Sequence, residues 1–236
     1  YYKKNTGLFK FISRDEINVF VDCRKFESDF VRTLLNYPIS CFFFQNDIFS
    51  LHASVIAFQG KVIMFPGSAL TGKSSIAAYF IKHGAQLVTE DTAVVEVLDN
   101  RAYVRSSYPF LKLSESANTE LSFSKSRGIA LQTDRNQRRG FLLNEKSFSG
   151  KLALIDYCIF LEYGEQESVE PFNLSEATLK LLSSSLNIYS LTETKQKELF
   201  HWSADLVRCL KVFRFRRRRG ILLSRFLATF IAKDKL

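Results

Sequence analysis

The sequence contains few of the features that cross-link a chain or anchor it in a membrane. Its four cysteines (Cys23, Cys41, Cys158 and Cys209) lie far apart, with no C-x-x-C pair and no histidine at ligand spacing. This argues against structural zinc and for reduced thiols in a cytoplasmic protein. No apolar run approaches the roughly 18 residues that cross a bilayer, and the opening Tyr1–Asn5 lacks the apolar core of a signal peptide. We therefore expect neither a disulfide scaffold nor a membrane protein.

Linkers and repeats are absent as well. The 236 residues include only 10 glycines and 4 prolines, and no stretch is rich in Gly, Pro or Ser. With 46% hydrophobic residues and 23 phenylalanines, the chain can bury a sizeable core. The order of strand-like and helical patterns predicts a single α/β domain over residues 1–236, with a mixed sheet and flanking helices. Residues 1–50 are expected to form strands and a helix that pack onto a core of residues 51–236.

The positive charge is concentrated near the C-terminus. Of the net charge of +9, seven charges lie between Arg208 and Arg219 without an intervening acidic residue. A basic segment of this kind suits a polyanion, but no nucleic-acid recognition motif accompanies it. We expect no nucleic-acid partner, and interpret the segment as a local patch that receives an acidic peptide or helps to hold phosphate.

Apolar periodicity predicts most elements of the domain. Helices are expected over residues 27–35, 75–83, from a cap at Ser175 to about 184, over 195–210 and over 221–232. Residues 152–163 are nearly all apolar and predict one buried central strand. The polar stretch 114–140 shows little periodicity and predicts a long irregular segment, which in a compact domain is usually functional.

The most specific motif is a phosphate-binding loop that fits G-x-x-x-x-G-K-[ST] at every fixed position. A β-rich run precedes it and a helical pattern follows it, as this motif requires. Successive backbone N–H groups and the helix N-terminus bind phosphate, a lysine neutralises it, and a hydroxyl can ligate Mg²⁺. The expected nucleotide-binding residues are Gly67, Ser68, Ala69, Leu70, Thr71, Gly72, Lys73, Ser74 and Ser75.

Two carboxylates follow the next predicted strand. The apolar run 86–89 ends in Glu90 and Asp91, where both side chains can face the loop. One can hold Mg²⁺ together with Ser74 while the other accepts a hydroxyl proton. A solvated acidic turn is the alternative interpretation from spacing alone.

Three segments over residues 52–91 together resemble the catalytic domain of HPr kinase/phosphorylase. They are Leu51-His52-Ala53-Ser54, Gly60–Phe65 followed by the phosphate-binding loop, and Gly84-Ala85-Gln86-Leu87-Val88-Thr89-Glu90-Asp91. In that family a histidine precedes the strand pair that leads into the loop, and two aspartates follow the next helix. Downstream, Tyr108-Pro109-Phe110-Leu111-Lys112-Leu113 is similar to an element of the HPr kinase-related proteins of peptide-modifying gene clusters, including kinases of lasso peptide precursors.

The resemblance implies a fold related to phosphoenolpyruvate carboxykinase and transfer of the γ-phosphoryl group of ATP, with Mg²⁺, to a Ser or Thr hydroxyl. It implies that Lys73 neutralises the phosphate, that Asp91 is the base, and that His52 lies beside that carboxylate. Glu90 stands where the family has its first aspartate, so the metal geometry differs. The longer signature of the bifunctional enzymes is missing, which argues against HPr as the substrate and against the reverse reaction.

Arginines of the irregular segment are candidates for a further phosphate contact. Arg135, Arg138 and Arg139 lie there, and a guanidinium suits the charge of a transferring phosphoryl group. We select Arg138; a solvated basic loop is the alternative. Glu115 is a weak candidate for a further metal ligand.

Three functions compete at this point. The first is a kinase of a ribosomally made precursor peptide, the second a small-molecule kinase acting for example on free serine, and the third a nucleotide-binding regulatory module without catalysis. All three share a nucleotide partner, and all leave a homo-oligomer open.

Overall fold

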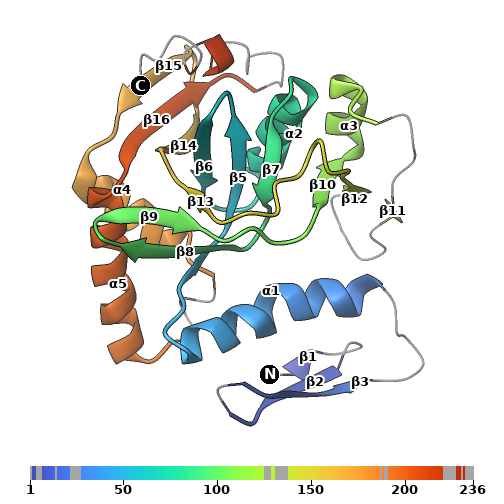
Figure 1. Ribbon diagram of the computed structural model, residues 1–236, viewed down its shortest axis with the longest axis vertical. Helices are drawn as coiled ribbons and strands as arrows, with labels where there is room; N and C mark the ends of the chain where they lie inside the picture. Colours follow the sequence, from blue (N-terminus) through green and yellow to red (C-terminus); the bar gives the residue numbers. More distant parts are fainter. Residues whose placement is uncertain are drawn as a thin grey trace.

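The computed structural model describes residues 2–3, 7–13, 15–21, 28–124, 129–130, 138–186, 188, 191–219, 227–229 and 231. Its centre is a six-stranded mixed sheet in the order β15-β16-β14-β6-β5-β7 (Figure 1). Strand β14 is parallel to β16 and to β6, whereas β5 is antiparallel to β6 and β7, and β15 to β16. The six strands are β5 (Ala53–Phe58), β6 (Lys61–Pro66), β7 (Gln86–Thr89), β14 (Tyr157–Tyr163), β15 (Ser168–Pro171) and β16 (Lys211–Arg217). The expected mixed α/β architecture is therefore confirmed.

Both faces of the central sheet are buried, and successive side chains divide between two cores. Ile63 and Ile159 belong to one core, which also contains the apolar side chains of helix α2 (Lys73–Lys82). Their neighbours Met64 and Cys158 belong to the other, together with residues of the last two long helices. This alternation is the period of two expected of a strand buried on both sides. The helices of the second core are α4 (Leu174–Ser183) and α5 (Glu193–Arg208).

Two smaller sheets flank the central one. The first has the order β13-β9-β8-β4 and lies over the core that contains α4 and α5. The second has the order β10-β12-β11 and packs beside α2, with helix α3 (Glu115–Leu121) following β10. The strands are β4 (Ser50–Leu51), β8 (Ala93–Leu98), β9 (Arg101–Val104), β10 (Phe110–Ser114), β11 (Ile129–Ala130), β12 (Arg138–Leu142) and β13 (Ala153–Leu154).

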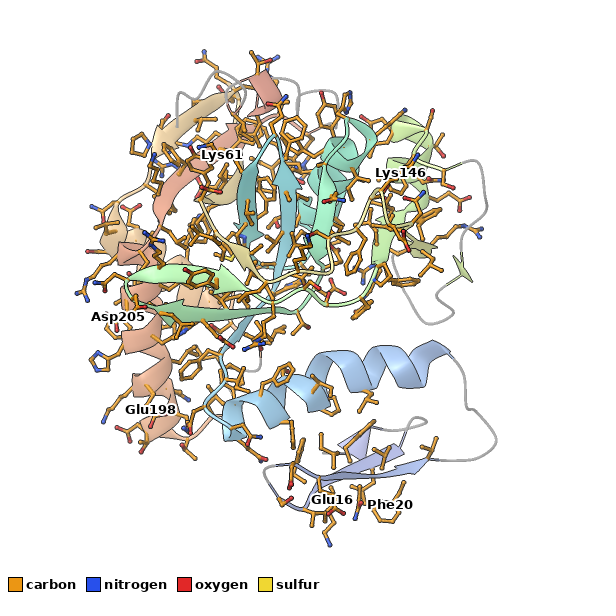
Figure 2. All side chains as sticks on the ribbon, in the orientation of Figure 1. Glu16, Phe20, Lys61, Lys146, Glu198 and Asp205 are labelled. Atoms are coloured by element: carbon orange, nitrogen blue, oxygen red, sulfur yellow. The ribbon has the colours of Figure 1, made fainter. Side chains whose placement is uncertain are left out.

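The N-terminal part forms a three-stranded sheet, β1 (Tyr2–Lys3), β2 (Gly7–Phe11) and β3 (Ile17–Val21), followed by helix α1 (Ser28–Gln45). Phe9 is fully buried, whereas Phe20 is 56% exposed and points away from α1 (Figure 2). The end of α1 contacts the rest of the chain through aromatic rings: Phe49 lies 5.7 Å from Phe44 of α1 and 5.2 Å from Trp202 of α5.

Several predicted boundaries are wrong for identifiable reasons. The helix predicted over 27–35 extends to Gln45 through Pro38, because a proline removes only one backbone donor and the later turns bury Ser40 and Phe44. The single strand predicted over 152–163 is two strands, since the chain leaves β13 at residue 154 and enters β14 at 157. Asn173 rather than Ser175 caps α4, accepting hydrogen bonds from the N–H groups of Ser175 and Glu176.

The segment predicted to be irregular over 114–140 is partly regular. Its start is the cap of α3, where the Ser114 hydroxyl accepts a hydrogen bond from the N–H of Ala117, and its end pairs with β10 as β12. Its residues 125–128 and 131–137, which include Arg135, lie outside the described residues, as does most of the helix predicted over 221–232. None of the helices in the described part of the chain is long and apolar enough to cross a bilayer. Cys41, Cys158 and Cys209 are free thiols, and Cys23 lies outside the description.

Candidate nucleotide site

The predicted phosphate-binding loop lies between β6 and α2, in the strand–loop–helix setting that the motif predicts. Its backbone has a positive φ at three residues: Gly67 (+146°), Leu70 (+67°) and Gly72 (+89°). The N–H of Gly67 donates to the carbonyl of His52 at 3.1 Å, which fixes the start of the loop to the residue that joins β4 to β5. The loop is thus held by the edge of the sheet on one side and by α2 on the other.

Lys73 is the first residue of α2 and is 5% exposed. Its Nζ donates to the carbonyl oxygens of Gly67 at 2.8 Å and Ser68 at 2.6 Å, so the side chain folds back over the loop. Burial lowers the pKa of Lys73 to about 8; the charges of Glu90 and Asp91 oppose this shift and that of Arg138 adds to it. A phosphate group near Lys73 would favour the charged ammonium.

Glu90 lies behind Ser74, away from the cavity. It is 1% exposed, and its two oxygens accept hydrogen bonds from the hydroxyls of Ser74 (2.5 Å) and Ser54 (2.7 Å). Burial and the charge of Asp91 raise the pKa of Glu90 to about 7, against the effect of the two hydroxyls and Lys112. Because the Ser74 hydroxyl donates its hydrogen bond to Glu90, the lone pairs of its oxygen remain available to a metal ion on the side of the cavity.

Asp91 occupies a tight bend. The N–H of Thr92 donates to the carbonyl of Glu90 at 2.8 Å, and Asp91 between them has a φ of +64°. A three-residue turn with this torsion is a strained conformation, of the kind that occurs at functional sites. The bend points the Asp91 carboxylate into the cavity that Lys73 and Ser74 also line.

Two cationic or protonatable groups contact the Asp91 carboxylate. Its Oδ1 lies 3.7 Å from Nε2 of His52, and its Oδ2 forms an ion pair with Nζ of Lys112. Burial alone would raise the pKa of Asp91, but the nearby His52 ring and the charge of Lys112 outweigh it and hold that pKa well below its usual range. Asp91 is therefore an anion fixed in position. Burial, with the charges of Asp91 and Glu90, also raises the pKa of nearby Tyr108.

One cavity of about 300 Å³ joins these groups. Its wall includes His52, Lys73, Ser74, Asp91 and Arg138, all of them predicted site residues. Loop residues complete one side of it: Ala69, Leu70, Gly72 and Ser75. Gly67, Ser68 and Thr71 belong to the loop but not to this wall.

The remaining predicted side chains are placed differently. Arg139 contacts Glu115 at 3.9 Å, and Glu115 is 62% exposed. In the described part of the chain no three His, Cys, Asp or Glu side chains cluster as a metal site would require. The groups present nevertheless suit Mg²⁺ at the loop, since the Ser74 hydroxyl and the Asp91 carboxylate offer hard oxygen ligands on the cavity wall.

Two basic residues of the wall were not singled out from the sequence, although one of them belongs to the basic segment that was expected to help hold phosphate. Lys112 lies on β10 and is 4% exposed; it is the fifth residue of the Tyr108–Leu113 element, and a lysine within an otherwise apolar strand is the signal that could have identified it. Arg217 lies on β16 and is 5% exposed. Within a run of four arginines the sequence does not show which side chain faces the cavity, because this depends on the pairing of β16 with its neighbours.

Comparison with known proteins adds little to this geometry. No family model matches the chain, and no curated protein matches it. Among solved structures, the Hpr(Ser) kinase/phosphatase from Coxiella burnetii superposes with a TM-score of 0.41 and 10% identity, over 79% of this chain and 99% of that one. A superposition of this quality shows neither a shared family nor a shared activity, so the functional argument rests on the cavity.

Proposed function

We propose that the protein is an ATP- and Mg²⁺-dependent kinase that transfers the γ-phosphoryl group to a Ser or Thr hydroxyl of a peptide. The observation that carries this proposal is one cavity that combines a glycine-rich loop, its lysine and serine, and a fixed carboxylate anion 3.7 Å from a histidine nitrogen. A nucleotide-binding loop alone requires no such carboxylate. Phosphoryl transfer to a hydroxyl does, because the proton of the hydroxyl must be accepted.

In this proposal the loop N–H groups and Lys73 bind the phosphates. The acceptor oxygen forms a bond to the γ-phosphorus, the bond from that phosphorus to the bridging oxygen breaks, and ADP departs with its electrons. The acceptor's proton passes to the Asp91 carboxylate. Ser74 would hold Mg²⁺, which supplies neutralisation of phosphate charge when bound.

Asp91 is better placed than Glu90 to receive the proton. The pKa of Glu90 is closer to neutrality, but both its oxygens already accept hydroxyl hydrogen bonds and it does not line the cavity. Asp91 does line it, and His52 and Lys112 fix its direction. Since this transfer depends mostly on positioning and charge, an accessible, oriented carboxylate matters more than its basicity.

The test is transfer of labelled phosphate from ATP with Mg²⁺ to a panel of Ser- and Thr-containing peptides, including any small peptide encoded beside the gene. A product heavier by about 80 Da is expected for one phosphoryl group. Asp91→Asn should lower the rate by about 10²–10⁴-fold while ATP still binds. Glu96→Gln is the matched control. Glu96 lies on β8 outside the cavity, where its carboxylate pairs with Arg105, so this change should leave the rate unchanged.

Each other result points to a different function. Transfer to free serine but to no peptide would replace the peptide kinase by a small-molecule kinase. ATP binding without any transfer would favour a regulatory module. An undiminished rate in Asp91→Asn would remove the base from the proposal, and absence of ATP binding by the wild type would refute it altogether.

A further inference from the structure

Side-chain donors hold the backbone carbonyls of the loop at both of its ends. Lys73 binds the carbonyls of Gly67 and Ser68, as described above. At the far end, Nη2 of Arg217 donates to the carbonyl of Thr71 at 3.1 Å, and the Tyr163 hydroxyl lies 3.5 Å from the carbonyl of Leu70. Two cations thus contact the loop, one from its own helix and one from a strand that is 146 positions away in sequence.

Arg217 is positioned by the central sheet. It is paired with Tyr163 in the parallel register of β14 and β16, and its guanidinium lies 5.0 Å from the centre of the Tyr163 ring. The guanidinium also lies against Gly72, where a Cβ would come within 2.1 Å of Nη2. The absence of a side chain at Gly72 is therefore what allows Arg217 to reach the loop.

The neighbouring arginines of β16 have other environments. Arg214 contacts Glu170 at 3.3 Å, and Arg216 lies 3.7 Å from Glu170 and 3.8 Å from Glu162, on the face of the strand opposite to Arg217. Arg217 alone of the three lines the cavity, together with Tyr163. A guanidinium on this wall can exchange the neutral carbonyl of Thr71 for a phosphate oxygen, which is a stronger acceptor for a cation.

We propose that Arg217 is a phosphate-binding residue of the nucleotide site, held in place by Tyr163 and Gly72. This inference rests on the proposed function, since it needs a polyphosphate in the cavity. It assigns an arginine contact with phosphate to β16, the last strand along the chain, whose Arg217 lines the same cavity as Arg138 of β12. Tyr163 acts through Arg217 and is a positioning residue.

The test measures the affinity of the full chain for ATP, for inorganic tripolyphosphate and for adenosine. Arg217→Gln should weaken binding of ATP and of tripolyphosphate by a similar factor, about 10- to 100-fold, because both lose the same charged contact. Arg217→Lys, which keeps the charge, should lose less. Arg216→Gln on the opposite face is the matched control and should bind both ligands as the wild type does.

A dependence on ionic strength separates a phosphate contact from a merely structural one. If Arg217 contacts phosphate, ATP binding by Arg217→Gln should weaken less steeply with added salt than binding by the wild type, while Arg217→Lys keeps the steeper dependence. Equal salt dependence in all three would assign Arg217 to loop structure only and overturn the inference. If Arg217→Gln does not fold, affinity decides between the two lysine variants: weaker binding of ATP and tripolyphosphate by Arg217→Lys than by Arg216→Lys supports the phosphate contact, and equal binding by the two overturns it.

The result also separates this inference from the proposed function. A wild type that binds neither ATP nor tripolyphosphate would refute both. A wild type that binds both ligands, with Arg217→Gln binding them equally well, would refute only the role of Arg217. ATP binding that depends on Arg217 without phosphoryl transfer would leave the role of Arg217 intact and refute the kinase.

Discussion

Replacement of Gly72 by alanine tests how the loop and the last strand fit together. The chain provides a matched control in Gly84, because Gly72 and Gly84 flank the same helix and have nearly the same torsion, φ +89° and +95°. A Cβ at Gly84 would meet no atom within 4 Å, whereas a Cβ at Gly72 would lie 2.1 Å from Nη2 of Arg217. Both variants carry the cost of a positive φ in alanine, about 1–2 kcal/mol.

Only Gly72→Ala must also displace Arg217. That displacement costs the hydrogen bond from the guanidinium to Thr71, about 1.5–3 kcal/mol, and part of the contact with the Tyr163 ring, about 0.5–2 kcal/mol. We therefore expect Gly72→Ala to lower the free energy of unfolding by about 2–4 kcal/mol more than Gly84→Ala. The measurement is denaturant unfolding, with the slopes compared so that a change of midpoint reports stability.

A double-mutant cycle identifies the source of the difference. In the background of Arg217→Ala the guanidinium is already gone, so Gly72→Ala should then cost no more than Gly84→Ala does. Equal losses for Gly72→Ala and Gly84→Ala in the wild-type background would refute the argument that Arg217 determines the need for glycine. The argument is also refuted if Gly72→Ala still costs more stability than Gly84→Ala in the Arg217→Ala background.

Further predictions concern the two buried charges beside the loop. Because the pKa of Glu90 is raised in the folded protein, the contribution of its protonated carboxyl to stability should be complete below the unfolded pKa of 4.5 and be lost as the pH rises to about 7, a loss of about 3 kcal/mol; in Glu90→Gln, measured in EDTA, this loss should be absent. An identical pH profile in the two proteins would contradict the placement of Glu90. Lys112→Met leaves the Asp91 carboxylate without its ion pair, so the pKa of Asp91 should rise towards 3.8 and stability at neutral pH should fall by about 3–5 kcal/mol. Since a depressed carboxylate pKa stabilises the protein above its unfolded value, Lys112→Met should also lose less stability than the wild type on acidification, and urea unfolding at pH 3 and 7 measures both effects.

The parts of the site that follow from local chemistry were predicted from the sequence. The loop from Gly67 to Ser74 lies between a strand and a helix as its spacing indicates. The carboxylates at residues 90 and 91 come directly after β7, which only β5 separates from β6 and its loop, so their approach to the loop depends on three strands that are close in sequence. In each case neighbouring residues along the chain determine the geometry.

Contacts between distant strands could not be predicted in the same way. Lys112 reaches Asp91 only because β10 packs beside α2, and Arg217 reaches the loop only through the parallel register of β14 and β16. Glu90 was interpreted as a ligand facing the phosphates because sequence position gives no direction for a side chain at the end of a strand. Its hydrogen bonds to Ser54 and Ser74 place it behind the loop instead.

Strand geometry distributes the positive charge near the C-terminus over different environments. Arg208 contacts Asp205, and Arg214 and Arg216 contact Glu162 and Glu170, so three of the seven cations lie against carboxylates. Alternation along β16 turns Arg217 to the other face, into the cavity. Arg219 follows it, 5.3 Å from the centre of the same Tyr163 ring. Arg217 and Arg219, rather than the whole segment, therefore place positive charge beside the proposed nucleotide site, where it would attract a polyphosphate.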